Sequence, residues 1–404
     1  NYKNFFVFSG ILSFFLWTDK SFFLPHPNGL LFGLVITILC LACYFVQDNI
    51  NRYFIPGLLA LWSSIFIASF FQDSGSIRDG FHFNFIQEEL LAVSTGRTNL
   101  VDFIPQYTFL LGFPLGLIKN IIKYDPTTFT LTYIILMQII CILIAIAIPV
   151  YICGKRIIPI SAFLSTSLVF SSTYYGITGP STYFQCFPIR LILPSITIFF
   201  LFISLFKDDL LKSFKNKKLI LISAFGIFNG LSIFSNIEFG IPFVGSSIIL
   251  MTFWSIFSNR KTQLLIFIPS ILLSILSFTL SIYLMTGEIP NFEYLFVFLK
   301  WFGVNNHFSH PMPAIGPHVI GISLFLFSNI ISITMLNNNR RRSFDSSYFI
   351  ALPATLFLTS TWGLLSLPYF LGRSFSSTFI SGYSYIIALL LSILLPTIIY
   401  STSI

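Results

Sequence analysis

A carboxylate and an imidazole stand three residues apart in the stretch Arg78-Asp79-Gly80-Phe81-His82, which directly follows a long apolar segment. Ionisable side chains beside a membrane-length apolar segment are costly and mark a functional site by default. Asp79 is the candidate general base, because a carboxylate there can accept the proton of an attacking hydroxyl. His82 shares its helical face and can orient the carboxylate or contact a phosphate. A helix N-cap for Asp79 and a structural interfacial histidine are the alternatives.

Further polar residues follow within thirty positions of this pair. Asp102, Gln106 and Tyr107 form a second cluster, for which we expect either loop ordering or a substrate contact. Glu88 and Glu89 lie between the two clusters, on a stretch with helical periodicity, and we expect them on the solvated face of that helix.

Two arginines and one glutamate stand at the ends of other apolar segments. Arg190 and Arg373 are candidate phosphate clamps, since a guanidinium binds phosphate through paired hydrogen bonds. An arginine that snorkels to the membrane surface and anchors its helix is the alternative for each. Glu238, in a short turn ending at Gly240, places one more carboxylate at such a boundary and is a further candidate for substrate binding.

His307 and His310 form a His-x-x-His pair close to Lys300 and Trp301. A third zinc ligand is missing from the pattern, and the pair lies in a predicted loop, so we expect phosphate or sugar binding there rather than zinc. The sequence predicts no metal site elsewhere, and a divalent metal has no supporting ligand spacing.

Composition decides the class of protein. Of 404 residues, 55% are hydrophobic and only 9% are charged, with 51 phenylalanines, which excludes a water-soluble domain and predicts an all-α polytopic membrane protein. The net charge of +8 comes from basic residues in short loops, a placement typical of membrane orientation, so nucleic acid is excluded as a partner. Cys40 and Cys43 form a C-x-x-C inside a predicted span and are interpreted as small apolar residues.

The chain is predicted to form a single transmembrane domain over residues 1–404. Its first apolar run is interpreted as a retained span rather than a removed signal peptide. The twelve predicted spans are residues 4–18, 29–47, 53–71, 128–152, 157–173, 189–206, 218–235, 240–257, 263–285, 317–336, 347–365 and 379–400.

Basic residues predict the orientation. With the Asp79 loop outside, fourteen Lys and Arg residues fall in inside loops and eight in outside loops, which places both termini in the cytoplasm. Residues 72–127 then form one large external loop, with interfacial helices at 84–95, ended by Gly96, and at 106–122. Residues 286–316 form a second external loop, and 173–188 and 366–378 are shorter ones.

The order of these features resembles the first external loop of the GT-C glycosyltransferases, integral membrane enzymes that use polyprenyl-phosphate-linked sugars. The resemblance covers residues 72–172, where an acidic residue after a span is followed by two juxtamembrane helices and a span that ends in a basic turn. The motifs that carry it are Asp79-Gly80-x-His82, Gly96, Val101-Asp102-Phe103-x-Pro105-Gln106-Tyr107 and Gly154-Lys155-Arg156.

The resemblance implies an inverting transfer of sugar from a polyprenyl-phosphate donor to an acceptor hydroxyl on the external face. The acceptor is a glycan, a lipid or a protein, and the implied partners are membrane lipids and subunits of a membrane complex. The family commonly has a second acid in the next external loop. Residues 173–188 contain none, and two extra spans precede Asp79. Either Glu238 takes the role of the second acid or this chain lacks that role.

Two other classes remain open on the residues alone. A ligase or polymerase of the O-antigen type would use the 286–316 loop and its histidines. A transporter or a non-catalytic membrane subunit would need no catalytic loop, although transporters place charges at the membrane midplane and often contain repeats, neither of which this sequence shows.

Overall fold

The computed structural model describes residues 80–106, 110, 112, 126–153, 185–206, 217–258, 261–300, 316–342, 348–372 and 376–402. This part of the chain is helical, with one isolated bridge between Asn99 and Phe103 and no strand. The helices are α4 (Gly80–Ser94), α6 (Pro126–Cys153), η2 (Gln185–Ile189, a π-helical turn), α8 (Ile192–Phe206), α9 (Lys217–Ser235), α10 (Ile237–Ser258), α11 (Lys261–Thr286), α12 (Glu293–Leu299), α13 (Pro317–Arg342), α14 (Tyr348–Leu365), α15 (Leu367–Leu371) and α16 (Ser376–Thr402).

Eight of the twelve predicted spans fall on described helices. Four of these helices are long and apolar enough to cross a membrane: Ile237–Ile256, Gln263–Thr286, Pro317–Asn337 and Ile350–Leu371. The corresponding apolar stretches of α6, α8, α9 and α16 are shorter. The predicted spans at 4–18, 29–47, 53–71 and 157–173 lie outside the described residues.

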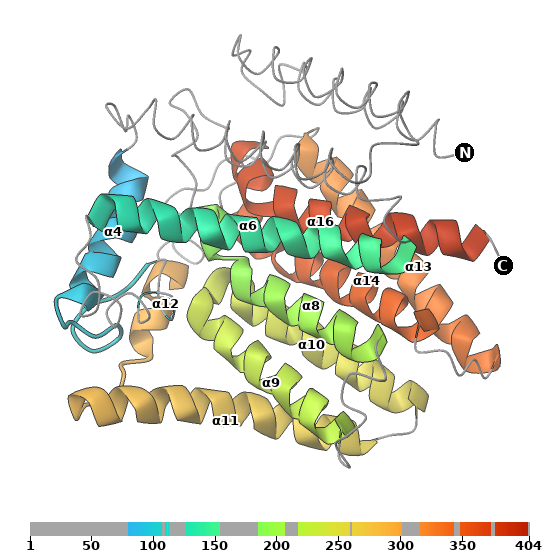
Figure 1. The fold of residues 1–404 in the computed structure, drawn as a ribbon, viewed down its shortest axis with the longest axis horizontal. Coiled ribbons are helices and arrows are strands. Elements are labelled where there is room, and N and C mark those ends of the chain that lie inside the picture. Colours follow the sequence, from blue (N-terminus) through green and yellow to red (C-terminus); the bar gives the residue numbers. More distant parts are fainter. Residues whose placement is uncertain are drawn as a thin grey trace, which may run out of the picture.

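The helices pack around α14, which is the most buried of the four long spans. α14 packs against α13, α10, α16 and α8, and Figure 1 shows α11 along the lower edge of the bundle. Side-chain hydrogen bonds join several of these helices. Thr361 Oγ1 of α14 donates to Asn329 Oδ1 of α13 at 2.9 Å, and the Tyr385 hydroxyl of α16 donates to the Cys141 carbonyl of α6 at 2.9 Å.

The outer surface of the bundle is apolar, while many hydroxyl groups face inward. Leu272 and Leu284 on α11 and Ile330 on α13 are among the exposed large side chains, at 60%, 74% and 65%. Buried Thr355 and Thr359 instead donate to carbonyls one turn back in their own helix, at 2.6 and 2.9 Å. Because lipid can solvate such an exterior and the hydroxyls are satisfied locally, the bundle suits a bilayer better than water.

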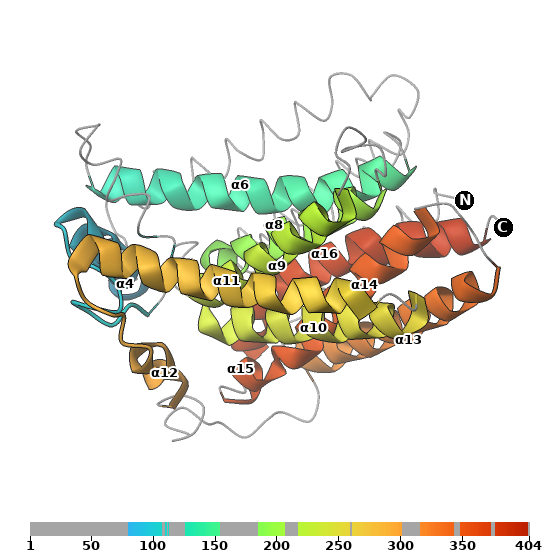
Figure 2. The ribbon, with the colours of Figure 1, turned by 90° about the horizontal axis from the view of Figure 1, so that it is seen from below.

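Several segments predicted to be external meet at one end of the bundle. Figure 2 shows α4, α12 and α15 toward the same end. Backbone contacts join them there: Leu110 N–H donates to the Phe234 carbonyl at 2.7 Å, and Asn291 N–H to the Leu100 carbonyl at 2.8 Å. Residues of the 72–127 segment thus contact both the end of α9 and the 286–316 segment, and the assignment of these segments to the external side stays a prediction.

The helix predicted at 84–95 is present as the C-terminal part of α4. Gly96 has a φ of 95°, and Arg97 N–H donates to the Ala92 carbonyl at 3.0 Å, so a left-handed residue ends this helix as expected. Of the second predicted interfacial helix, at 106–122, the structure describes only residues 106, 110 and 112, so this prediction lies largely outside the described part.

Candidate functional site

A buried ion pair lies at the end of the bundle where the predicted external segments meet. Arg190 Nη2 is 2.9 Å from Glu238 Oε2, and the two side chains are 3% and 13% exposed. Arg190 follows the π-helical turn η2, whereas Glu238 is in the first turn of α10. The two residues were predicted separately as substrate-binding candidates, and the structure brings them into direct contact.

Aromatic side chains enclose this pair. The Arg190 guanidinium lies over the ring of Tyr369 in α15, with Cζ 4.7 Å from the ring centroid. Phe239, next to Glu238, packs against Tyr369 and Tyr383 with ring centroids 5.3 and 5.8 Å away. The pair is thus held between η2, α10, α15 and α16, in surroundings that exclude water and strengthen charge interactions.

The sequence of the α9–α10 turn explains the position of Glu238. Asn236 Oδ1 accepts the Phe239 N–H at 3.1 Å, which caps the start of α10 and fixes its first turn. At Gly240 a Cβ would lie only 2.1 Å from the Ser232 carbonyl oxygen, so only glycine allows α10 to pass this close to the end of α9. The Trp362 indole N–H donates to the Phe239 carbonyl at 3.0 Å and ties the turn to α14.

The segment carrying Arg190 is anchored from two sides. The ring of Phe187 packs on Tyr385 of α16 with centroids 4.9 Å apart, and the Ser235 hydroxyl donates to the Ile189 carbonyl at 3.5 Å. The peptide bond between Phe187 and Pro188 is cis. These contacts direct Arg190 into the bundle, where it forms an ion pair. The alternative of an arginine that snorkels to the surface is therefore wrong for Arg190.

A second set of carboxylates orders the loop after α4. Asp102 Oδ2 accepts the Thr98 N–H at 2.6 Å, and Glu89 Oε1 accepts the Gln106 N–H at 2.5 Å. Asp102 thus makes the kind of contact expected of a residue that orders the loop, whereas Gln106 takes part through its backbone only and the role predicted for its side chain stays a prediction. The expectation of a solvated Glu89 is wrong, because it is 8% exposed and holds the loop, while Glu88 is exposed as predicted.

Several predicted site residues cannot be compared with the structure. Asp79, Tyr107, His307, His310 and Arg373 lie outside the described residues. His82 falls within α4, but its side chain also lies outside them. Their roles stay predictions.

Two residues near the ion pair were missed by the sequence reasoning. Tyr369 covers Arg190, and its only sequence signal is a tyrosine in the short Leu-Pro-Tyr-Phe-Leu stretch of a predicted loop. His318 is 3% exposed at the start of α13 and stacks on Phe370 with ring centroids 5.2 Å apart. The signal that could have identified His318 is its position directly after the proline that begins a predicted span.

Within the described residues, no group of three or more His, Cys, Asp or Glu side chains comes together. The positive charge of the observed site is that of Arg190, whose guanidinium contacts Glu238 and the ring of Tyr369.

The fold and composition define a helical membrane protein. No protein-family model, curated protein or solved structure matches the chain.

Proposed function

We propose that this chain is a GT-C-like glycosyltransferase that moves a sugar from a polyprenyl-phosphate donor to an acceptor hydroxyl, with inversion, at the external face of the membrane. The observation that carries the proposal is the 2.9 Å contact between Arg190 and Glu238. Arg190 carries a guanidinium, which is suited to phosphate, and Glu238 is a carboxylate that we expect near the reaction. They come from separate segments of the chain and meet at one end of an apolar bundle.

In the structure Glu238 neutralises Arg190. When the donor binds, its phosphate takes the place of the carboxylate at the guanidinium, because phosphate offers the same paired acceptor geometry with more charge. Arg190 is 3% exposed, so this exchange requires Tyr369 on the short helix α15 to move aside. The displaced Glu238 is then free to contact the sugar or the acceptor.

The reaction step needs one base and one anion site. The acceptor oxygen forms a bond to the anomeric carbon, and its proton passes to Asp79. The bond from that carbon to the phosphate oxygen breaks, and Arg190 stabilises the negative charge that stays on polyprenyl phosphate. His82 and Arg373 are the proposed second contacts to Asp79 and to the phosphate. The carboxylates of Asp102 and Glu89 order the loop after α4 by accepting the Thr98 and Gln106 N–H groups.

The test uses native membranes that contain the acceptor. Membranes with the wild-type protein or a variant receive a panel of polyprenyl-phosphate sugars, and mass spectrometry measures the polyprenyl phosphate released. We expect Asp79→Asn to slow release about 100-fold to 10,000-fold, the usual contribution of a general base. Arg190→Lys keeps the charge but loses the paired hydrogen bonds, and we expect it to raise the KM for the donor.

The matched control is Glu88→Gln, which removes an exposed carboxylate from α4 and should leave release unchanged. Full activity of Asp79→Asn combined with loss of activity in His307→Ala or His310→Ala would favour an O-antigen ligase or polymerase instead. Absence of release with every donor would favour a non-catalytic subunit or a transporter.

A further inference from the structure

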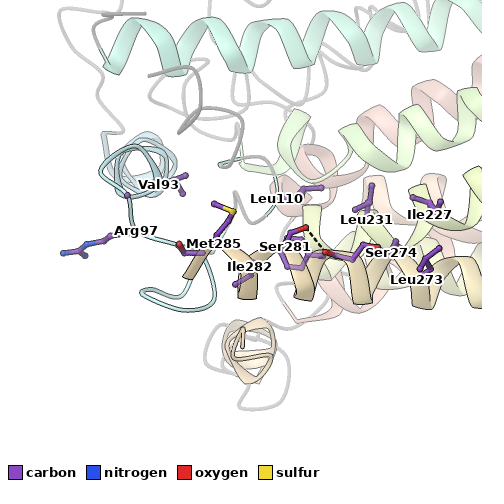
Figure 3. Close-up of a pocket in the computed structure, with 14 residues that line it drawn as sticks. Val93, Arg97, Leu110, Ile227, Leu231, Leu273, Ser274, Ser281, Ile282 and Met285 are labelled. Carbon is purple, nitrogen blue, oxygen red and sulfur yellow. Dashed lines mark hydrogen bonds between the residues drawn. The ribbon is translucent and has the colours of Figure 1, made fainter. Parts of the chain in front are cut away.

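An apolar groove runs along the side of the bundle, between α9 and α11, and ends under the loop after α4. Its volume is about 600 Å³. Figure 3 shows the groove extending from Leu273 and Ile227, within the bundle, to Met285 and Val93 at the end where α4 lies. Arg97 lies at that outer end, with its guanidinium directed away from the bundle.

The wall of the groove offers space but few hydrogen bonds. Ser274 and Ser281 line it, yet their hydroxyls donate within α11, to the Ile271 and Ser277 carbonyls, both at 2.8 Å. The serines therefore act as small side chains that leave room beside α11, while Leu231 and Phe278 supply apolar contact. Such a wall fits a hydrocarbon chain.

The length of the groove matches one leaflet of a bilayer. Its lining along α11 runs from Leu273 to Met285, which at 1.5 Å per residue is about 18 Å. The hydrocarbon core of one leaflet is about 15 Å thick, half of a core of roughly 30 Å. A chain that enters at the outer end would thus fill the groove and end near the middle of the membrane.

The charge at the outer end selects the headgroup. Among the residues that line the groove, Arg97 is the one ionisable side chain, and it is exposed. Within the described part of the chain, the ion pair found is that of Arg190 and Glu238, so no described carboxylate neutralises Arg97. An anionic headgroup at the membrane surface supplies the missing charge.

We propose that this groove holds one acyl chain of an anionic glycerophospholipid, with the lipid phosphate against Arg97. The bound lipid fills the space between α9 and α11 and joins the loop after α4 to the end of α11. The groove is separate from the ion-pair site, because its lining includes no residue of η2, α10 or α15. A ring stack of Phe234 on Phe278, with centroids 3.9 Å apart, stands beside it. This proposal does not depend on glycosyl transfer.

The experiment reconstitutes the full chain in vesicles of three parts phosphatidylcholine to one part phosphatidylglycerol, with a trace of phosphatidylglycerol carrying a diazirine halfway along one acyl chain. After irradiation, peptide mass spectrometry locates the label. We expect labelling concentrated on residues 273–285 and competed by unlabelled phosphatidylglycerol. Arg97→Gln should reduce the preference for phosphatidylglycerol over phosphatidylcholine about fivefold, the effect of one basic residue at a membrane surface.

A matched pair of phenylalanine substitutions tests the groove itself. Ser277→Phe places a ring in the groove and should remove the labelling, whereas Leu276→Phe changes the neighbouring residue, which is 63% exposed and does not line the groove. Size-exclusion profiles establish that both variants fold, and if Ser277→Phe does not, Ser281→Phe replaces it. Labelling that survives in the folded variant, or that is spread evenly over lipid-facing helices, would overturn the proposal. Displacement of the label by polyprenyl phosphate but not by phosphatidylglycerol would also overturn it, by assigning the groove to the donor.

Discussion

On one side of the α9–α10 hairpin, Arg190 and Glu238 are buried against Tyr369, whereas on the other side a groove lies open between α9 and α11. The charged side is closed because a charge in a low-dielectric site must keep its partner. The apolar side tolerates an opening because a lipid chain can fill it at little cost. Under the two proposals, this hairpin borders both a closed site that a charged ligand opens and a groove that takes up hydrocarbon from the bilayer.

The largest effect is expected on the charged side. Glu238→Ala leaves Arg190 buried without its partner, and we expect a loss of about 3–5 kcal/mol in the free energy of unfolding, measured by denaturation in detergent micelles. Arg190→Met combined with Glu238→Leu removes both charges and should recover most of that loss. If the double variant were less stable than Glu238→Ala, the two side chains would contribute to stability independently. The contrast between the two sides of the hairpin would then fail.

The next effect concerns the loop over the apolar side. Glu89 is 8% exposed and accepts the Gln106 N–H, so Glu89→Ala should cost about 1.5–3 kcal/mol, the usual value for a hydrogen bond to a charged group. Hydrogen exchange of the Gln106 amide measures the local part of this loss. Glu88→Ala, one residue earlier and exposed, is the control and should exchange like the wild type. Equal protection in all three proteins would show that Glu89 does not hold the loop.

The apolar side itself is tested at the contact between α9 and α11. A Cβ at Gly230 would lie 2.8 Å from the Ile271 carbonyl and closer still to Ser274 Oγ, so Gly230→Ala should push the helices apart at a cost of about 1–3 kcal/mol. Gly245→Ala is the control, since its Cβ would meet only the end of Leu365, at 3.3 Å. Thermal unfolding in the same detergent compares the two. Equal changes in the unfolding temperature of the two variants would mean that close packing at Gly230 does not hold α9 to α11.

Much of the fold could be predicted because its signals are local. Long apolar runs gave eight helices near their predicted positions, and Gly96 ended α4 where its left-handed conformation was expected. The burial of Glu89 could not be predicted, because its partner is a backbone amide 17 residues away that no helical pattern reveals. From helical periodicity alone, both Glu88 and Glu89 were predicted to lie on the solvated face of the helix.

The ion pair could not be predicted for the same reason, because its two residues are far apart in the sequence. Arg190 and Glu238 were each marked by a charge at the end of an apolar run, but their pairing depends on how η2 and α10 pack against each other. Tyr369 gave a weaker signal, since aromatic residues at helix ends are common in any membrane protein. The charged residues could therefore be identified from the sequence, whereas the residues that contact them could be identified only from the tertiary structure.

The smallest effect is expected at Asp102, where a substitution tests whether the order of the loop after α4 influences lipid binding in the groove. Asp102 is exposed and accepts the Thr98 N–H at 2.6 Å, so Asp102→Ala should cost about 1 kcal/mol and speed exchange of the Thr98 amide. Asp102→Asn keeps an acceptor oxygen and is the matched control. Because Thr98 lines the groove beside Arg97, the alanine variant should also weaken the preference for phosphatidylglycerol while labelling along α11 persists. If hydrogen exchange of the Thr98 amide speeds up but the preference for phosphatidylglycerol does not change, the order of this loop does not determine how Arg97 contacts the lipid headgroup.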